Sequence, residues 1–188
     1  MRWIRPTAVL LGLSLLAVPM SASIKAMSLH EYMQMTAETL HGTILSKETF
    51  KSDFPEAGTV YTRVVVEGDA WRSERPMQTE LVYMGSHDPK DRYFMSEMPE
   101  FRDVRLGGEI VVFWGQDESI QPGRTSNVVW NLANVYRVER GFGEPVVIGK
   151  GEGSAFPENV KLSDARSRIK AMHALIEAEH EAHQHGDK

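Results

Sequence analysis

The hydrophobic pattern of the chain begins, after a leading apolar segment, with positions that recur at helical spacing. They predict a helix over residues 29–40. Ser28 and Glu31 match a capping box, in which each side chain bonds the backbone N–H of the other residue. Gly42 stands where a C-terminal glycine cap is expected. The predicted apolar face consists of Leu29, Tyr32, Met33, Thr36 and Leu40.

From Thr43 onward, alternation of apolar and polar positions replaces helical spacing and predicts six short strands. In the clearest strand, Val60, Thr62, Val64 and Val66 share one face. Residues 109–114 are apolar on both faces, which is typical of a central strand covered on both sides. The predicted strands span residues 44–50, 59–67, 79–84, 109–114, 132–138 and 144–148.

Closely spaced strands without intervening helices predict a mainly β fold, either a small antiparallel β-barrel (OB-like) or a sandwich, with an N-terminal helix and a C-terminal helix. The connection from Ser86 to Arg105 is long for a hairpin, and loops of this length are often functional. Its apolar residues also suit a simpler role, which is to cap an open end of the barrel. They are Tyr93, Phe94, Met95, Met98 and Phe101.

The last helix is predicted to begin near Ser163, with Ala165, Ile169, Met172 and Ile176 as its apolar stripe. After Ile176 the stripe turns polar, so we expect the helix to dock through that residue and then fray. The domain organisation that follows is a barrel-like domain over residues 24–160 and a C-terminal helix with a His-rich tail over residues 161–188.

Residues 1–23 read as a signal peptide. Arg2 and Arg5 precede an apolar run from Thr7 to Val18, and small residues follow at 21–23. The run is short for a bilayer, so we expect cleavage, no transmembrane segment afterwards, and a periplasmic or extracellular protein.

Composition narrows the possible functions. Cleavage after residue 23 would leave 165 of 188 residues, enough for one domain, and would change the formal net charge from −5 to −7. An acidic chain without a basic stripe disfavours nucleic acid as a partner. The absence of cysteine excludes disulfides, thiol catalysis and iron–sulfur clusters.

Several segments between Ser28 and Ser163 resemble a set of exported bacterial domains. They are Gly42-Thr43-Ile44, residues 61–66, residues 98–101, residues 108–113, Tyr136-Arg137-Val138 and residues 149–154. The resemblance implies a compact β-barrel-like domain, and it transfers no catalytic or cofactor-binding residue because the set has no established activity. Residues 102–106 are additional here, so the loop that contains them departs from the pattern of the set.

The C-terminal tail offers one candidate metal site. His173, Glu177, His180 and His183 follow one another at spacings of four and three residues and fall along one helix stripe. Imidazole and carboxylate ligands suit zinc, nickel or copper(II). Histidine near a helix C-terminus also interacts favourably with the helix dipole, which is the alternative reading.

A second candidate metal site combines His30 and Met35 with Met98. These soft or borderline ligands suit copper(I) in an exported protein. The alternative is that the methionines fill gaps in the core. The site requires the predicted N-terminal helix and the long loop to meet in space.

The sequence gives little support for catalysis. It lacks a G-x-S-x-G elbow and an H-E-x-x-H motif, and no acidic residue stands out as a general base. Residues 149–154 invite a phosphate-cradle reading, but no helix pattern follows them, so a loop is the better interpretation. We therefore assign no catalytic residue, and a hydrolase with an unrecognised site stays an alternative.

Aromatic residues supply the last candidate, a stacking surface for a glycan or a peptide. Trp71 and Trp130 stand beside polar residues and are expected to be half exposed, and Trp114, Tyr83 and Tyr93 complete the set. Together these observations predict an exported, non-catalytic domain that binds an unidentified protein or envelope component. The rival is metal binding through the histidine tail or the Met/His cluster.

Overall fold

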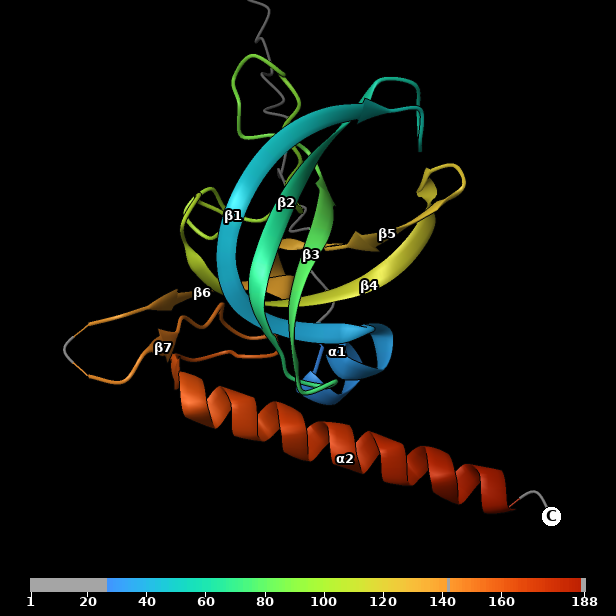
Figure 1. Cartoon of the computed structure of the whole chain (residues 1–188), viewed down its shortest axis with the longest axis vertical. Coiled ribbons are helices and arrows are strands. Elements are labelled where there is room, and N and C mark those ends of the chain that lie inside the picture. Colours follow the sequence, from blue (N-terminus) through green and yellow to red (C-terminus); the bar gives the residue numbers. More distant parts are fainter. Residues whose placement is uncertain (1–26, 142, 187–188) are drawn as a thin grey trace, which may run out of the picture.

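The computed structural model describes residues 27–141 and 143–186. In these residues the strands form a single barrel (Figure 1). The predicted signal peptide, residues 1–23, lies outside the described residues. None of the helices in the described part is both long and apolar enough to cross a membrane.

Five strands form the closed barrel: β1 (Glu38–Ser52), β2 (Thr59–Ala70), β3 (Arg75–Met84), β4 (Glu109–Gln121) and β5 (Arg124–Val128). Their order is β1-β2-β3-β5-β4, and β4 pairs back with β1 to close the sheet. All neighbours are antiparallel except β3 and β5, which pair in parallel. This arrangement confirms the prediction of a mainly β, OB-like barrel.

The alternation predicted for β2 is borne out in the barrel interior. Val64 and Val66 project inward with Leu40 and Ile44 of β1, and all four are buried. Because these apolar side chains leave water together, their burial is the main force that closes the barrel. From the other barrel strands and the loops, the interior cluster also contains Leu81, Tyr83, Met98, Val104, Ile110, Val112, Trp114, Val129 and Val135.

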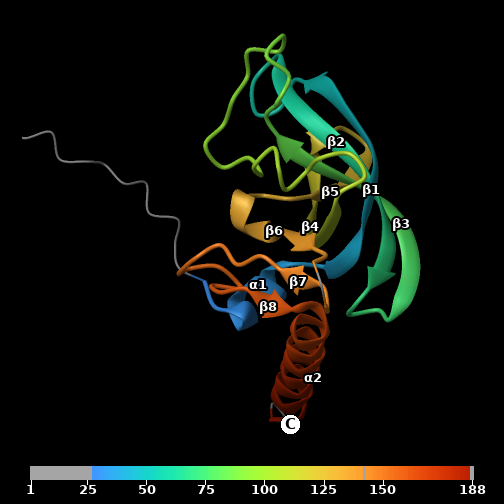
Figure 2. The same cartoon turned by 90° about the vertical axis from the view of Figure 1, so that its left-hand side faces the viewer.

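A second layer covers the outside of β4. It consists of α1 (Leu29–Met35), β6 (Val135–Glu139), β7 (Val146–Val147), β8 (Val160–Lys161) and α2 (Leu162–Gly186). β6 pairs with β4, and β7 and β8 continue the sheet from β6. Figure 2 shows α2 leaving this layer and projecting beyond the barrel.

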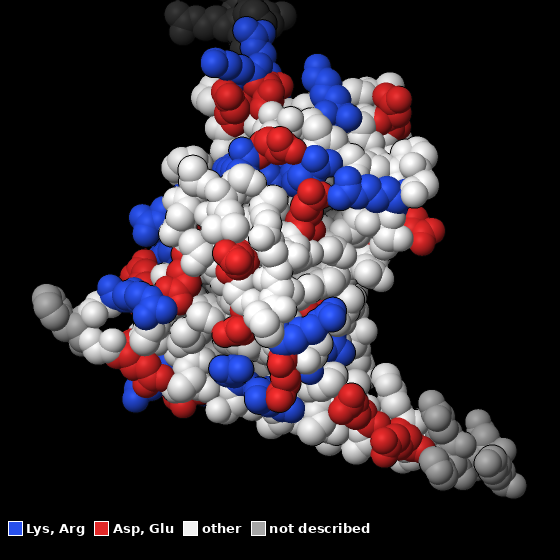
Figure 3. Space-filling model, in the orientation of Figure 1, with Lys and Arg blue, Asp and Glu red and all other residues white. Residues whose placement is uncertain are grey.

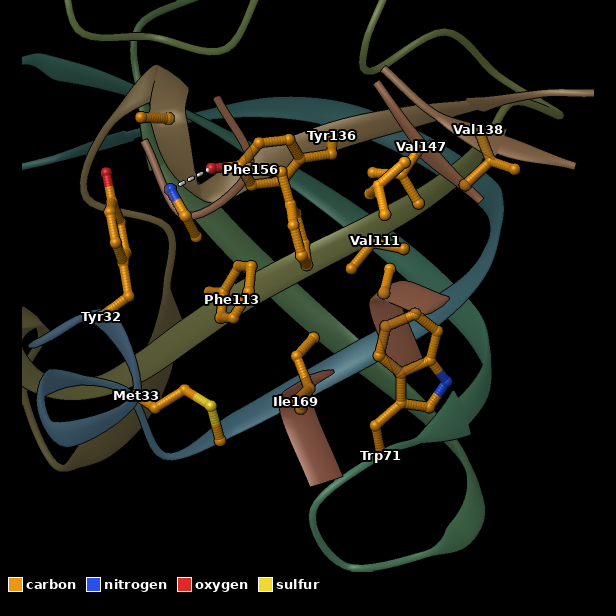
Figure 4. Packing of buried hydrophobic residues seen from close by; sticks show 14 of the residues in the cluster. Tyr32, Met33, Trp71, Val111, Phe113, Tyr136, Val138, Val147, Phe156 and Ile169 are labelled. Carbon is orange, nitrogen blue, oxygen red and sulfur yellow. Dashed lines mark hydrogen bonds between the residues drawn. The ribbon is translucent and has the colours of Figure 1, made fainter. Parts of the chain in front are cut away.

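An aromatic cluster fills the space between the barrel and this second layer (Figure 4). The rings of Phe113, Tyr136 and Phe156 lie 5.2–6.1 Å apart, centroid to centroid. The Tyr136 hydroxyl accepts a 2.9 Å hydrogen bond from the backbone N–H of Ala155. Because Phe113 faces this cluster while Val112 faces the barrel interior, β4 is covered on both sides, as predicted.

The N-terminal helix is shorter than the predicted 29–40. Its capping box is confirmed, but α1 ends at Met35, and β1 begins at Glu38. The prediction is wrong at this end because the residues from Glu38 onward gain ladder partners in β4 and β2. Gly42 is therefore a strand residue rather than a helix cap. It lies opposite Gly68, so close that a Cβ atom at Gly42 would meet the carbonyl oxygen of Glu67 at 2.4 Å.

The C-terminal half differs from the prediction in three further ways. β4 continues to Gln121 and pairs there with β5, which was not predicted. The predicted strand 132–138 starts with a 3-10 turn, Leu132–Asn134, before β6. α2 remains helical to Gly186 instead of fraying after Ile176, and its contact with α1 continues past that residue, since Glu179 lies 3.1 Å from His30.

Candidate functional site

The most distinctive surface lies along the second half of β1. β4 pairs with β1 only from Glu38 to Thr43, so beyond Ile44 the edge away from β2 has no strand beside it. The β3–β4 connection, residues 85–108, runs next to this edge (Figure 1). Between them lies a pocket of about 510 Å³, lined by residues 47–49 and by parts of the connection. We call this pocket the β1 groove.

A β-bulge decides which side chains face the groove. The pairing of β1 with β2 shifts register between Ile44 and Ser46, so Leu45 is an extra residue. After the bulge, Lys47 lies opposite Val64. Directly opposed residues share a face of the sheet, and Val64 belongs to the barrel interior, so Lys47 projects toward the open end of the barrel.

Lys47 is a half-buried cation without an acidic partner. Its Nζ lies 3.2 Å from His87 Nδ1 and 5.3 Å from the centre of the Phe101 ring. No ion pair in the described part of the chain involves Lys47. Burial lowers the pKa of Lys47, and no neighbouring carboxylate opposes that effect.

His87 acts as a neutral acceptor beneath this lysine. Its Nδ1 faces both the ammonium of Lys47 and the hydroxyl of Tyr83, which lies 3.4 Å away. Burial lowers the pKa of His87 and the charge of Lys47 lowers it further, against a smaller opposing contribution from the carbonyl of Pro99. The imidazole therefore provides a dipole to the lysine but no negative charge.

The far wall of the groove is fixed by a buried ion cluster. Asp103 is 1% exposed and lies 2.5 Å from Lys150 Nζ and 3.2 Å from Arg137 Nη1. Gly107 also donates its N–H to the carbonyl of Ile44 at 2.8 Å. These contacts hold residues 101–108 against β1 and β6, so the groove is formed before any ligand arrives.

The loop prediction is confirmed in part. Met98 is buried in the barrel interior and Met95 packs against it, as expected of residues that cap the barrel end. Phe94 and Phe101 do not follow that expectation, because their side chains are exposed. Phe101 and Leu106, 64% and 66% exposed, instead give the groove an apolar rim.

Two acidic residues and a second cation also line the groove. Glu48 accepts a 2.8 Å hydrogen bond from Arg63 on the opposite face of β1. Asp88 accepts a hydrogen bond from the backbone N–H of Lys90. Arg105 also lines the groove, and its charge contributes to lowering the pKa of Glu139. The groove therefore presents the half-buried charge of Lys47 beside apolar surface, in a protein whose net charge is negative.

The outer face of β1–β3 is different. In OB-folds this face and its flanking loops often bind ligands. Here Arg63 contacts both Glu48 and Glu80, and Arg124 also pairs with Glu80. Figure 3 shows positive and negative side chains intermixed on this face. Each of these four charged side chains has a partner of opposite sign on the same face.

A further pocket lies beside that face, between the β1–β2 and β4–β5 loops. Its volume is also about 510 Å³, and Phe54, which is partly exposed, and Pro122 contribute apolar surface. Ser52 Oγ donates a hydrogen bond to the carbonyl of Ile120 at 2.6 Å and bridges the ends of β1 and β4 that lead into the two loops. The bridge closes part of the site through an internal contact, so we place the main site in the β1 groove.

The predicted histidine site lies along α2. His173 Nε2 is 3.6 Å from Glu177 Oε1, and His183 Nδ1 bonds the carbonyl of Glu179. His180 lies on the same helix. In the described ranges no three histidine, aspartate or glutamate side chains are grouped to hold a metal ion.

The members of the second predicted metal site belong to different parts of the fold. His30 Nε2 lies 3.1 Å from Glu179 on α2, and Met98 packs in the barrel interior. Met35 is exposed at the end of α1. The structure thus gives His30 a carboxylate partner and gives Met98 the core role that the alternative reading assigned to it.

The aromatic surface is also divided. Trp71, expected to be half exposed, is 1% exposed in the second core, so that expectation is wrong. Trp114 and Tyr83 are buried in the barrel interior. Trp130 is 42% exposed, as expected, and its ring lies over Gly115 so closely that a Cβ atom there would meet it at 1.8 Å.

The glycine-rich segment 149–154 has a structural task. Its Lys150 points to Asp103, and no helix follows to hold a phosphate, which agrees with the loop interpretation. Sequence reasoning missed the β1 groove, because a bulge and an absent strand neighbour leave no mark in periodicity. An inward-facing lysine in a strand is the signal that could have revealed it, had the register been known.

Comparisons with protein-family models, with curated proteins and with solved structures give no match.

Proposed function

We propose that this protein is an exported, non-catalytic binding domain that holds an anionic ligand with an apolar portion in the β1 groove. The observation that carries the proposal is Lys47, a half-buried cation that has no carboxylate partner among residues 27–141 and 143–186. Buried charges in folded proteins are usually paired, so an unpaired one inside a preformed pocket indicates a charge that the ligand supplies.

The chemistry of the groove fits both halves of such a ligand. A carboxylate beside Lys47 would form a charge-assisted hydrogen bond, a class worth about 1.5–3 kcal/mol. Arg105 at the rim adds a second positive charge that would attract an anion from solution. Phe101 and Leu106 offer exposed apolar surface, which a ligand would remove from water.

A matched pair of small probes tests the proposal. We expect 4-phenylbutyrate to shift the amide NMR signals of residues 47–49 and 101–106, whereas 4-phenylbutylamine, with the opposite charge, leaves them in place. Lys47→Met is expected to weaken the binding that causes this response about tenfold or more. Lys161→Met, which removes a lysine from β8 outside the groove, is the matched control and is expected to retain it. Equal responses to acid and amine, or an unchanged response in Lys47→Met, would reject the proposal.

Export is the second part of the proposal, and residues 1–23 support it through their charged start, apolar run and small residues. The ligand would accordingly be part of an envelope component or of another exported protein. Mass spectrometry of the protein recovered from outside the cytoplasm is expected to show a chain that begins at Ile24. A chain that retains residues 1–23 in the cytoplasm would refute export.

A further inference from the structure

The open edge of β1 presents unused backbone groups to the groove. Gly85 donates its N–H to the carbonyl of Val60, so Val60 directs its backbone groups to the β3 side. Neighbouring strand residues alternate in this respect, and therefore Tyr61, Arg63 and Val65 bond to β1. Their partners in β1 are Phe50, Glu48 and Ser46. The residues between and beside these partners, Lys47, Thr49 and Lys51, consequently direct their N–H and C=O groups away from β2.

Those outward-facing groups are accessible. Thr49 and Lys51 are exposed, and Lys47 is half-buried. None of the hydrogen bonds found among the described residues reaches the outward backbone groups of these three positions. A row of alternate free donors and acceptors at strand spacing is a template for one more strand.

We propose, on the basis of the function proposed above, that the ligand is an acidic polypeptide segment that adds to β1 as an antiparallel strand. An added strand would complete the sheet where β4 diverges from β1. The antiparallel direction follows that of both other neighbours of β1. Main-chain bonds supply affinity in this mode of recognition, and side-chain pockets supply specificity.

Charge selects an acidic segment over a second copy of this chain. The most symmetric self-pairing, centred on Thr49, would place Lys47 of one copy opposite Lys51 of the other, and directly opposed like charges are destabilising. An acidic residue opposite Lys47 would share its face of the sheet and meet the ammonium. The same lysines discourage indiscriminate edge pairing, so they contribute to specificity as well as to affinity.

The register makes a sharp prediction about the peptide backbone. Residues of an antiparallel partner that lie opposite Lys47, Thr49 and Lys51 share their face and direct their own N–H groups toward β1. In a capped octapeptide that alternates aspartate with leucine, the aspartates take these positions. N-methylation of the aspartates would therefore block binding, whereas N-methylation of the leucines would leave the N–H groups that face β1 intact.

The experiment measures affinity for three such octapeptides by calorimetry with the unmodified protein. We expect N-methylation of the aspartates to weaken binding about tenfold or more, since interstrand hydrogen bonds are lost, and N-methylation of the leucines to change it by less than about twofold. Equal losses from both modifications, or no binding of the unmodified octapeptide, would overturn the strand-addition proposal.

A protein variant supplies the second arm. Thr49→Pro removes an outward N–H that no strand uses, a position where proline is tolerated. It is expected to weaken octapeptide binding about tenfold while 4-phenylbutyrate still binds. If the unmodified protein binds 4-phenylbutyrate but not the octapeptide, only strand addition is rejected. If it binds neither ligand, the groove is rejected as a binding site. If Thr49→Pro does not fold, the N-methylated peptides decide alone.

Discussion

Two lysines from different parts of the chain contact the same loop segment, residues 101–103, and show how differently a buried charge can be used. Lys150 lies 6.0 Å from the centre of the buried Tyr136 ring and contacts Asp103, which also contacts Arg137. Lys47 lies 5.3 Å from the centre of the Phe101 ring, which is exposed, and its Nζ contacts the neutral His87 instead of a carboxylate.

The difference is that the charge of Lys150 is paired inside the protein, whereas the charge of Lys47 is available to a ligand. The ion cluster around Asp103 is internal, so its groups balance each other and hold the loop in place. Lys47 bears the cost of burial without compensation from a carboxylate. We infer that the first arrangement maintains the shape of the groove and that the second determines what enters it.

The largest expected effect comes from breaking the internal cluster. Asp103→Asn leaves the nearly buried ammonium of Lys150 without its counter-ion, and removal of one partner from a buried ion pair typically costs about 3–5 kcal/mol. Urea denaturation should therefore show a lower free energy of unfolding by that order. A loss below about 1 kcal/mol would mean that the cluster does not hold the loop, since exposed ion pairs have values of that size.

A paired substitution sharpens this result. Asp103→Leu combined with Lys150→Met removes both charges and is expected to recover most of the lost stability, because buried ion pairs are often replaced by apolar residues at little cost. If the double variant is as unstable as the single one, the loop depends on packing at residue 103 rather than on charge.

Removal of Lys47 should have the opposite signature. Lys47→Met is expected to leave the free energy of unfolding unchanged or to raise it, because an uncompensated charge is removed. The same variant should bind 4-phenylbutyrate at least about tenfold more weakly, a loss of about 1.4 kcal/mol or more in binding free energy. A clear loss of stability in Lys47→Met would show that this lysine is structural like Lys150.

Binding through Lys47 should also depend on pH. Burial places the pKa of this ammonium below its ordinary value of 10.5, so it loses its proton at lower pH than a free lysine. The affinity for 4-phenylbutyrate should therefore fall as the pH rises through the lowered pKa, as titrations in alkaline buffers would show. Lys47→Arg should bind without this decline, and a decline that persists in Lys47→Arg would assign the pH dependence to another group.

The smallest effect concerns His87. Its pKa lies below 6.5 because of burial and, secondarily, the charge of Lys47. In Lys47→Met the second cause disappears, so the His87 pKa should rise but remain below 6.5 in an NMR titration. Because the unfolded chain binds the proton more readily, His87 contributes stability above pH 6.5 that is lost as the pH falls through its lowered pKa. An unchanged His87 pKa in Lys47→Met would show that the charge of Lys47 does not influence the imidazole.

Much of the fold could be predicted from the sequence because its periodicities are local. The alternation of Val60 to Val66 and the doubly apolar strand at residues 109–114 both report burial directly, and they led to an OB-like barrel. The end of α1 could not be predicted, since Leu40 fits a helix face and a strand face equally well. Only the pairing with β4, distant in sequence, decides between them.

The site was less accessible to prediction than the fold. Candidate residues were chosen by chemical type, and the tail histidines and the Met/His set satisfy that criterion without meeting at one point. Lys47 carries no motif, and its importance arises from what is missing around it. An absent counter-ion is a property of three-dimensional neighbours, which spacing along the chain does not encode.

The extra residue at Leu45 has a consequence for the polarity of the whole recognition surface. Without the bulge, Leu45 would pair with Val65 and every later side chain of β1 would exchange sides, so that Glu48 would face inward and Lys47 outward. The groove would then present a negative charge to its ligand. The bulge, which absorbs one residue of β1, thus sets the sign of the charge inside the groove.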